Sequence, residues 1–181
     1  MIKNLTVGAV LTGVFVLPGA SPASATSAPV KPLTTGTIAT AAAPGSPASN
    51  ARLTNRQALT RLAAAGIKRP VGHTSLEGVR ARTIQGVIAL KRASRCTITI
   101  TGGTERGHGV GPRSHALGYK LDLRTHHEGV CLTRWIKTTQ RKGSPRGNDP
   151  RWYGNLNGIS LEYVYETPRG GGGVHWDITF N

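Results

Sequence analysis

A regular alternation of apolar and polar residues predicts four β-strands in the second half of the chain. This period of two is typical of strands with one buried face, and it runs through residues 97–101, 119–124, 159–166 and 174–180. In the last segment the large apolar residues share one face, so His175 and Asp177 point to the other. The same alternation places Asp122 and Glu166 opposite the apolar residues of their own segments. We therefore expect a sheet whose polar face collects these four side chains.

Apolar residues at helical spacing predict three helices, at about 55–65, 76–94 and 129–141. The first helix begins in the run Thr54-Asn55-Arg56-Gln57, which has the form of a capping box. Between the third helix and the next strand, residues 142–158 are rich in turn-forming residues and predict a long surface loop. The expected fold is therefore α+β, a mainly antiparallel four-stranded sheet with helices on its apolar face.

The first 50 residues differ in composition from the rest of the chain. A single early lysine, an apolar run and the small-residue pattern Ala23-Ser24-Ala25 predict a secretory signal peptide over residues 1–25. The apolar run is about 13 residues long, too short for a membrane span of roughly 20 residues. Residues 26–50 are rich in Ala, Pro, Thr and Ser and predict a flexible linker. We expect a secreted, extracellular protein with one catalytic domain, residues 51–181.

The chain is strongly basic, with 23 Lys and Arg against 8 Asp and Glu. All eight acids lie beyond residue 50, so the basic excess belongs to the domain. Such a field favours an anionic partner, although it also serves solubility. For an exported protein the available polyanions are wall polymers, extracellular nucleic acid and anionic membrane, and composition alone does not choose among them.

Two cysteines, Cys96 and Cys131, remain in the predicted mature chain. An even number of cysteines in an oxidising compartment predicts a disulfide. The alternative is a pair of separate buried thiols. Because the chain has no C-x-x-C spacing, we do not expect a zinc site with cysteine ligands.

Two histidines and one aspartate form the strongest candidate for a metal site. His115 and Asp122 are seven positions apart, and Gly118 between them permits a turn into the strand. His175 on the last strand would supply the third ligand. A zinc ion held by two imidazoles and one carboxylate keeps a coordination position open, which favours a hydrolase over a structural site. Manganese is the alternative ion.

These residues also carry a resemblance to a known family. Ser114-His115-x-x-Gly118-x-x-x-Asp122 resembles the S-x-H-x-x-G-x-x-x-D signature of the hedgehog/D,D-peptidase zinc metallopeptidases, with Ser and His adjacent here. The closing Val174-His175-Trp176-Asp177 resembles the strand of that family's third ligand. The similarity covers about residues 95–180. It implies a secreted zinc peptidase that acts on peptidoglycan stem peptides, often as a D-alanyl-D-alanine carboxypeptidase.

The sequence departs from the family at the catalytic base. The family usually places a glutamate three residues before the last histidine, and this chain has Gly172 there. Glu166 is our first choice for the general base, since it could end the preceding strand near the metal. Glu105, after the first predicted strand, is the competing choice. Asp177 is expected to accept a hydrogen bond that fixes the tautomer of an imidazole.

Several residues around the motif are candidates for substrate binding. A guanidinium suits a substrate carboxylate or an oxyanion, and Arg106 and Arg113 flank the motif. Each arginine has the simpler alternative of belonging to the basic surface. Ser114 lies within the motif, and His108 lies in a glycine-flanked loop where it would bind substrate or donate a proton.

Three functions follow from this constellation. The leading one is a zinc peptidase that cuts peptidoglycan stem peptides. The second is a muramidase-like glycoside hydrolase in which two of Glu105, Asp122 and Glu166 act as a carboxylate pair. The third is a non-catalytic wall-binding module with a structural metal. The expected partner is peptidoglycan or another anionic wall polymer, and the expected state is a monomer. Nucleic acid is not expected, because no recognisable nuclease constellation is present.

Overall fold

The computed structural model describes residues 50–69, 72–167 and 172–181. The predicted signal peptide and nearly all of the predicted linker lie outside these residues. Within the described part of the chain, no helix combines the length and the apolar character needed to cross a membrane.

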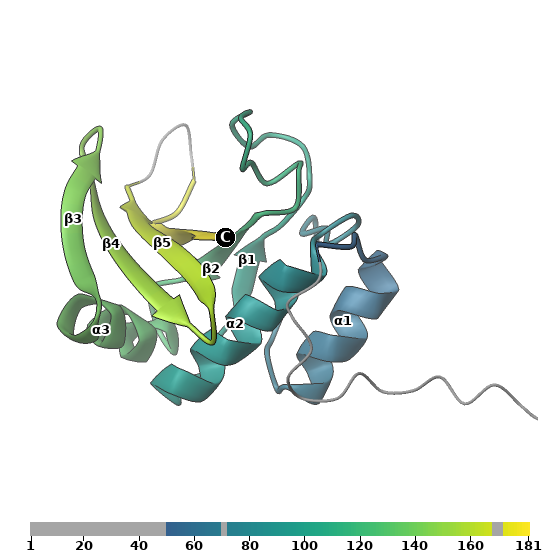
Figure 1. Ribbon diagram of the computed structural model, residues 1–181, viewed down its shortest axis with the longest axis horizontal. Coiled ribbons are helices and arrows are strands. Elements are labelled where there is room, and N and C mark those ends of the chain that lie inside the picture. Colours follow the sequence, from purple (N-terminus) through teal and green to yellow (C-terminus); the bar gives the residue numbers. More distant parts are fainter. Residues whose placement is uncertain (1–49, 70–71, 168–171) are drawn as a thin grey trace, which may run out of the picture. The chain divides into compact units, whose positions relative to one another are not determined.

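The described residues form three helices and six strands (Figure 1). The helices are α1 (Asn55–Ala64), α2 (Ala81–Ser94) and α3 (Gly129–Thr139). The strands are β1 (Ile100–Gly102), β2 (Lys120–Arg124), β3 (Arg141–Arg146), β4 (Asp149–Leu156), β5 (Ile159–Glu166) and β6 (His175–Phe180). All neighbouring strands pair antiparallel in one sheet, in the order β1-β2-β6-β5-β4-β3. The α+β class and the antiparallel sheet are confirmed, whereas the prediction of four strands is wrong.

The two additional strands come from residues 142–158, which the sequence predicted as a loop. This segment instead forms most of the β3–β4 hairpin, which turns near Gly147 at a positive φ of 61°. Pro145 lies within β3. Because β3 is an edge strand, it can hold a proline, which has no N–H to donate to a neighbour. The next turn, Asn157-Gly158, has positive φ at both residues, as a tight hairpin turn requires.

The helices lie close to their predicted ranges, except at the start of α2. The capping box of α1 is present, because Thr54 accepts a hydrogen bond from the N–H of Gln57 and the Gln57 side chain accepts one from the N–H of Thr54. Helix α2 begins at Ala81 and not near residue 76. Gly78, at a φ of 75°, turns the chain, and its N–H donates to the carbonyl of Leu53. That backbone bond links the start of α1 to the residues before α2.

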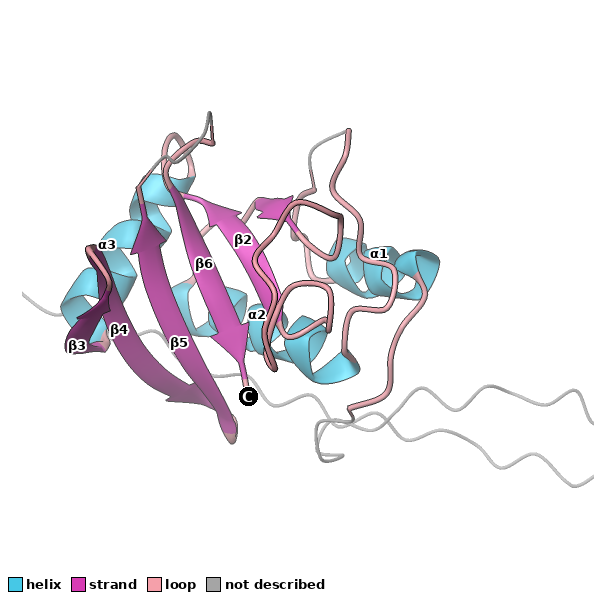
Figure 2. Cartoon of the chain, turned by 90° about the horizontal axis from the view of Figure 1, so that it is seen from above, coloured by secondary structure: helices cyan, strands magenta, loops and turns pink. Residues whose placement is uncertain are grey.

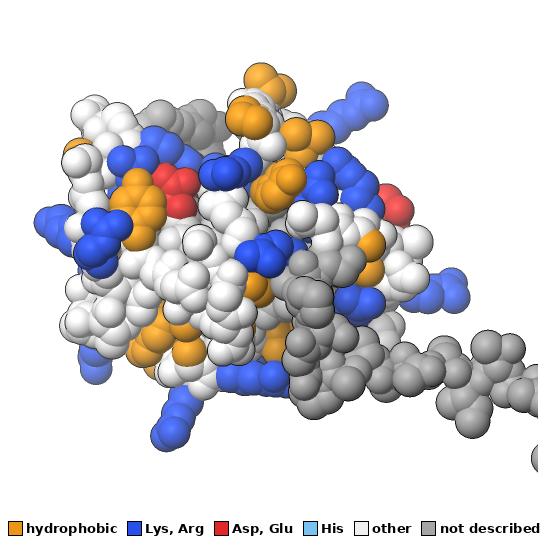
Figure 3. Space-filling view, viewed as in Figure 1, with side chains coloured by type: hydrophobic (Ala, Val, Ile, Leu, Met, Phe, Trp, Pro, Cys, Tyr) orange, Lys and Arg blue, Asp and Glu red, His pale blue; other side chains and the backbone are white. Residues whose placement is uncertain are grey.

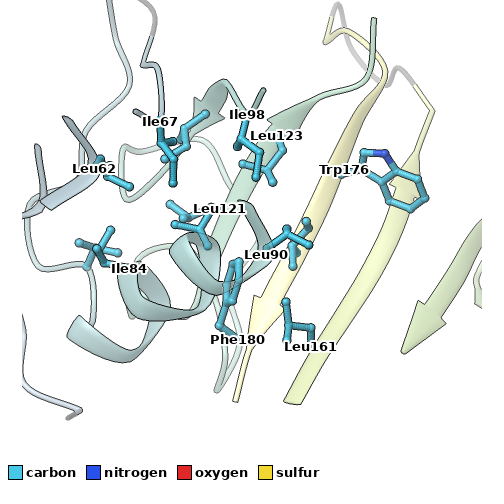
Figure 4. Close-up of a cluster of buried hydrophobic side chains, with 14 of the residues drawn as sticks. Leu62, Ile67, Ile84, Leu90, Ile98, Leu121, Leu123, Leu161, Trp176 and Phe180 are labelled. Carbon is cyan, nitrogen blue, oxygen red and sulfur yellow. The ribbon is translucent and has the colours of Figure 1, made fainter. Parts of the chain in front are cut away.

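The hydrophobic core lies between α2 and one face of the sheet. Figure 4 shows Ile84 and Leu90 of α2 close to Leu121 of β2 and Phe180 of β6, and all four side chains are fully buried. In Figure 2, α2 and α3 lie behind the strands and α1 lies to one side, so none of the described helices covers the front face of the sheet. The predicted disulfide is confirmed: Cys96, just after α2, is bonded to Cys131 in α3.

Gly86 permits the closest contact in this core. A Cβ atom at this position would lie 2.3 Å from the ring of Phe180. Alanine is ordinarily the better helix former by about 1 kcal/mol. We nevertheless expect Gly86→Ala to lower the free energy of unfolding by about 1–3 kcal/mol, because the core has no room for the methyl group. Urea unfolding measures this, with the exposed Arg92→Ala on the same helix as a control that should change it by less than about 0.5 kcal/mol. A stabilised Gly86→Ala variant would contradict the packing described here.

Candidate metal centre

The polar face of the sheet brings four of the predicted site residues together. Asp122 of β2 lies directly opposite Asp177 of β6, and Glu166 of β5 lies directly opposite His175 of β6. Because β2, β6 and β5 are neighbours, these side chains occupy adjoining positions on the face away from the core. The convergence expected from the alternation is therefore found.

His115 reaches this cluster from the loop that joins β1 to β2. The N–H of Gly118 donates to the carbonyl of His115 over 2.7 Å and closes a tight turn. Gly118 has a φ of 76°, and a Cβ there would lie 2.5 Å from the carbonyl oxygen of Gly78. Glycine is thus required both by the backbone conformation and by the close approach of another backbone segment. The turn directs the buried imidazole of His115 toward β2.

Both imidazoles are anchored through Nδ1. His115 donates from Nδ1 to the carbonyl oxygen of Gly103 over 2.7 Å, and His175 donates from Nδ1 to that of Gly173 over 2.8 Å. A carbonyl can only accept, so the proton of each neutral ring belongs to Nδ1 and the lone pair to Nε2. This is how metal-binding histidines are usually oriented. The acceptors are backbone carbonyls, whereas the sequence pointed to Asp177 for this role.

The Nε2 atoms of both imidazoles approach one carboxylate oxygen. Oδ1 of Asp122 lies 3.3 Å from Nε2 of His115 and 3.7 Å from Nε2 of His175. It is buried and has no hydrogen-bond partner among the described residues, and the same holds for Oδ1 of Asp177, which is 3.5 Å from Nε2 of His115. Buried polar atoms are nearly always paired. Two such oxygens facing the same nitrogen indicate a position that favours a cation.

The pKa of His115 supports this conclusion. Burial alone would lower it, but the nearby carboxylates of Asp122 and Asp177 outweigh burial and raise the pKa to about 9. For His175, the hydrogen bond to Glu166 is the main reason that the pKa rises to about 9, against the opposing effect of burial. The carboxylates thus favour positive charge on both imidazoles.

The spacing of the donor atoms fits a zinc ion. Zinc lies about 2.0–2.2 Å from nitrogen and oxygen ligands, so tetrahedral ligands are about 3.3–3.5 Å apart. The separations of 3.3 and 3.7 Å from Oδ1 of Asp122 to the two Nε2 atoms are close to this value. The pairs Asp122–His115 and Asp122–His175 are therefore each compatible with binding to one zinc ion.

A second grouping, His108, His115 and Asp122, could also hold a metal ion, since their donor atoms all lie within 4.8 Å of one another. The ring of His108 stacks on that of His115, with centroids 3.9 Å apart and planes inclined by 15°. Imidazole lone pairs lie in the ring plane, so two stacked rings cannot both direct them at one ion. His108 would have to turn before it could bind an ion held by His115. His115 and Asp122 are common to this group and to the one predicted from the sequence, which has His175 as its third member.

The two candidate bases differ in their surroundings. Oε2 of Glu166 lies 3.2 Å from Nε2 of His175, and this hydrogen bond is the main reason that the pKa of Glu166 is lowered. Glu105 accepts hydrogen bonds from the N–H groups of Ser75 and Gly103 over 2.8 and 3.0 Å. Glu166 lines the pocket above the centre and Glu105 does not. The geometry thus favours Glu166, whereas Glu105 organises the loop.

Two basic residues at the site were missed by sequence reasoning. Nζ of Lys120 and Nη2 of Arg146 each lie 2.6 Å from Oδ2 of Asp177, and Arg146 also contacts Glu166. Burial alone would raise the pKa of Asp177, but His115 and these cations lower it. Lys120 could have been found, because it lies two residues before Asp122 on the same strand face. Arg146 could not, because its strand was predicted as a loop.

An open pocket of about 530 Å³ lies above this cluster. Its wall is the loop 108–115, which includes the predicted substrate-binding residues His108, Arg113 and Ser114. Arg113 is exposed and Ser114 is buried. The fourth, Arg106, is exposed and does not line the pocket. The donor atoms are therefore accessible to a ligand from solvent.

The chain gave no match to known proteins. No protein-family model, no curated protein and no solved structure matches it. Its α+β class follows from its own strand pairing, and the chemistry of the metal centre follows from its own donor atoms.

Proposed function

We propose that the protein is a secreted zinc-dependent peptidase that cleaves the stem peptides of peptidoglycan. Two imidazoles anchored through Nδ1 converge on a buried oxygen of Asp122 that has no hydrogen-bond partner among the described residues, and this convergence carries the proposal. The substrate class is supported by the resemblance of Ser114–Asp122 and Val174–Asp177 to the hedgehog/D,D-peptidase motifs.

Four residues that line the pocket have roles in this proposal besides the metal ligands. A bound zinc ion polarises a carbonyl group and lowers the pKa of water. Glu166 accepts the proton at Oε2. Arg113, exposed at the pocket wall, binds a substrate carboxylate. Lys120 and Arg146 keep Asp177 ionised beside His115.

The glycosidase alternative has weaker support. A glycoside hydrolase needs a general acid, a carboxyl group whose pKa is raised. Two of the three carboxylates suggested for the pair are Glu105 and Glu166, and hydrogen bonds lower the pKa of each of them although burial opposes this. A purely structural metal would ordinarily have four protein ligands, whereas here the donor set adjoins an open pocket.

Digestion of purified peptidoglycan tests the proposal. We expect amino acids or peptides to be released, without new reducing saccharide ends, and a chelator to abolish the release until zinc is restored. Mass spectrometry of the soluble fragments identifies the bond that is cut. Reducing ends formed in the presence of chelator would establish the glycosidase instead, and metal binding without any product would favour the binding module.

The role of Glu166 can be tested against that of Glu105. We expect Glu166→Gln to lower kcat by about 10²–10⁴-fold, the usual contribution of a general base, while zinc content stays unchanged. Glu105→Gln is the matched control, because the same change there removes a carboxylate that does not itself line the pocket, although it bonds to His108, which does. It should lower kcat less than about tenfold. A larger loss for Glu105→Gln than for Glu166→Gln would reverse the assignment.

A further inference from the structure

The basic excess is concentrated away from the metal centre. Residues 50–104, which include α1, α2 and β1, contain ten Lys and Arg and a single acid, Glu77. The other seven acids all follow residue 104, and Asp122, Glu166 and Asp177 among them belong to the centre. On the face drawn in Figure 3, Lys and Arg side chains far outnumber acidic ones. The metal centre therefore does not account for this charge.

Part of this charge surrounds a concave surface between the first two helices. A pocket of about 390 Å³ has Ala64, Ala65 and Ile88 on its apolar side and Lys91, Arg92 and Arg95 around it. Arg92 and Arg95 are exposed. Among the described residues, none of these three cations forms an ion pair. They are available to a ligand.

A second basic hollow lies beside the first. It has a volume of about 420 Å³ and is lined by Lys68, Arg69, Thr97, Thr99, Arg124 and Glu128. Lys68 is tied to β1 by two backbone hydrogen bonds, with Ile98 and Ile100. Only Cys96 separates Arg95 of the first hollow from Thr97 of the second. We name Lys68, Arg69, Lys91, Arg92 and Arg95 the α1–α2 basic surface.

Local structure does not account for this surface. Cations in the last turn of a helix complement its dipole, which explains Lys91 and Arg92 of α2. Arg95, the C-cap of α2, lies at the same helix end, whereas Lys68 and Arg69 lie outside the helices and gain nothing from that effect. The one acid in either hollow, Glu128, is already bonded to Arg124 and Thr99. Among the described residues the remaining cations form no ion pair, although Arg69 donates to the carbonyl of Thr74 over 2.9 Å and Lys91 to that of Cys96 over 3.5 Å.

The composition of the surface indicates the chemistry of its ligand. In the described part of the chain the exposed large hydrophobic residues are Val110, Leu117 and Val130, so the surface has no apolar side chain for insertion into a membrane. It has no aromatic residue on which a nucleobase could stack. What remains is recognition of phosphate by Lys and Arg. Cations in hollows suit a thin, flexible chain better than a rigid duplex, whose phosphates lie on the outside of a wide rod.

We propose that the α1–α2 basic surface is a second binding site, which takes a flexible linear polymer with a phosphate group in each repeat. Anionic wall polymers of the phosphodiester type have this chemistry. The two hollows share no residue with the pocket of the metal centre. The site would thus hold the protein on such a polymer whatever reaction the metal centre performs.

The test is binding of the full chain to fluorescent inorganic polyphosphate at several salt concentrations. We expect Arg92→Glu/Arg95→Glu to weaken binding at least about tenfold near 0.15 M salt. The slope of log K against log salt should fall in magnitude by about 1.4, because each of the two lost phosphate contacts contributes about 0.7. Arg141→Glu/Lys142→Glu is the matched control. It removes the same charge from β3, at the opposite edge of the sheet from β1, and should weaken binding less than about threefold.

Two results would overturn the proposal. Equal weakening by both double variants would mean that only total charge matters. Duplex DNA that competed as strongly as polyphosphate of equal phosphate content would contradict a site for a thin chain. If charge reversal unfolds the protein, as circular dichroism would show, Arg92→Gln/Arg95→Gln replaces it with the same ranking expected. A failure of peptidoglycan cleavage would leave polyphosphate binding unchanged, so the two proposals fail separately.

Discussion

Asp122→Asn is expected to lower zinc affinity by more than about 100-fold and to abolish peptidase activity. Mutation of a residue that only hydrogen-bonds to a metal ligand typically lowers metal affinity 10–100-fold. We expect a larger effect for Asp122, because it supplies the oxygen on which both imidazoles converge. The substitution keeps the shape of the side chain while it removes the negative charge. Metal content after dialysis against a graded zinc buffer measures the affinity, and peptide release from peptidoglycan measures the activity.

The control for Asp122→Asn is Glu162→Gln. Glu162 lies on β5, pairs with Arg151 over 3.0 Å and does not line the pocket. We expect its zinc affinity and activity to stay within about threefold of the wild type, because Glu162 contacts neither the predicted metal ligands nor the pocket. Thermal unfolding of the metal-free variants shows that both are folded. Zinc affinity retained by Asp122→Asn would remove Asp122 from the ligand set.

Loss of the disulfide is expected to cause the largest change in stability. The bond closes a loop with a sequence separation of 35 between Cys96 and Cys131. The chain-entropy relation gives about 4 kcal/mol for a loop of this length. For a domain of this size that corresponds to a Tm lower by roughly 10–20 °C. Scanning calorimetry of Cys96→Ser/Cys131→Ser measures the change.

Reductant provides the internal control for the disulfide. The wild type should lose stability when it is reduced, and the double variant should be insensitive to the same treatment. The bond links the residue after α2 to the middle of α3. A change in unfolding free energy below about 1 kcal/mol would mean that other contacts hold these two helices together.

Local patterns were sufficient for the elements that carry most of the site. Strands β2 and β6 alternate because one face packs on the core and the other is polar, and β5 does so except at Val164, a buried apolar residue on the polar face. This alternation identified Asp122, Glu166, His175 and Asp177 as neighbours before any pairing was known. The capping box at Thr54 likewise located the start of α1.

The remaining parts depend on tertiary contacts that no local pattern encodes. Strand β3 contains Gly143 and Pro145, which are typical of turns, and it is a strand only because β4 pairs with it. With β3 missing from the prediction, Arg146 could not be placed beside Glu166 and Asp177. The carbonyls of Gly103 and Gly173, which anchor the two imidazoles, belong to the backbone. Every residue type carries such a carbonyl, so the identity of a residue does not indicate that its carbonyl anchors an imidazole.

X-ray absorption spectroscopy of the zinc-loaded protein tests the central claim most directly. We expect one zinc ion per chain, bound by two imidazole nitrogens and a carboxylate oxygen. His115→Ala and His175→Ala should each lose one imidazole from the zinc shell. His108→Ala should lose none. A chain that binds no zinc, or a spectrum that loses an imidazole in His108→Ala but not in His175→Ala, would contradict it.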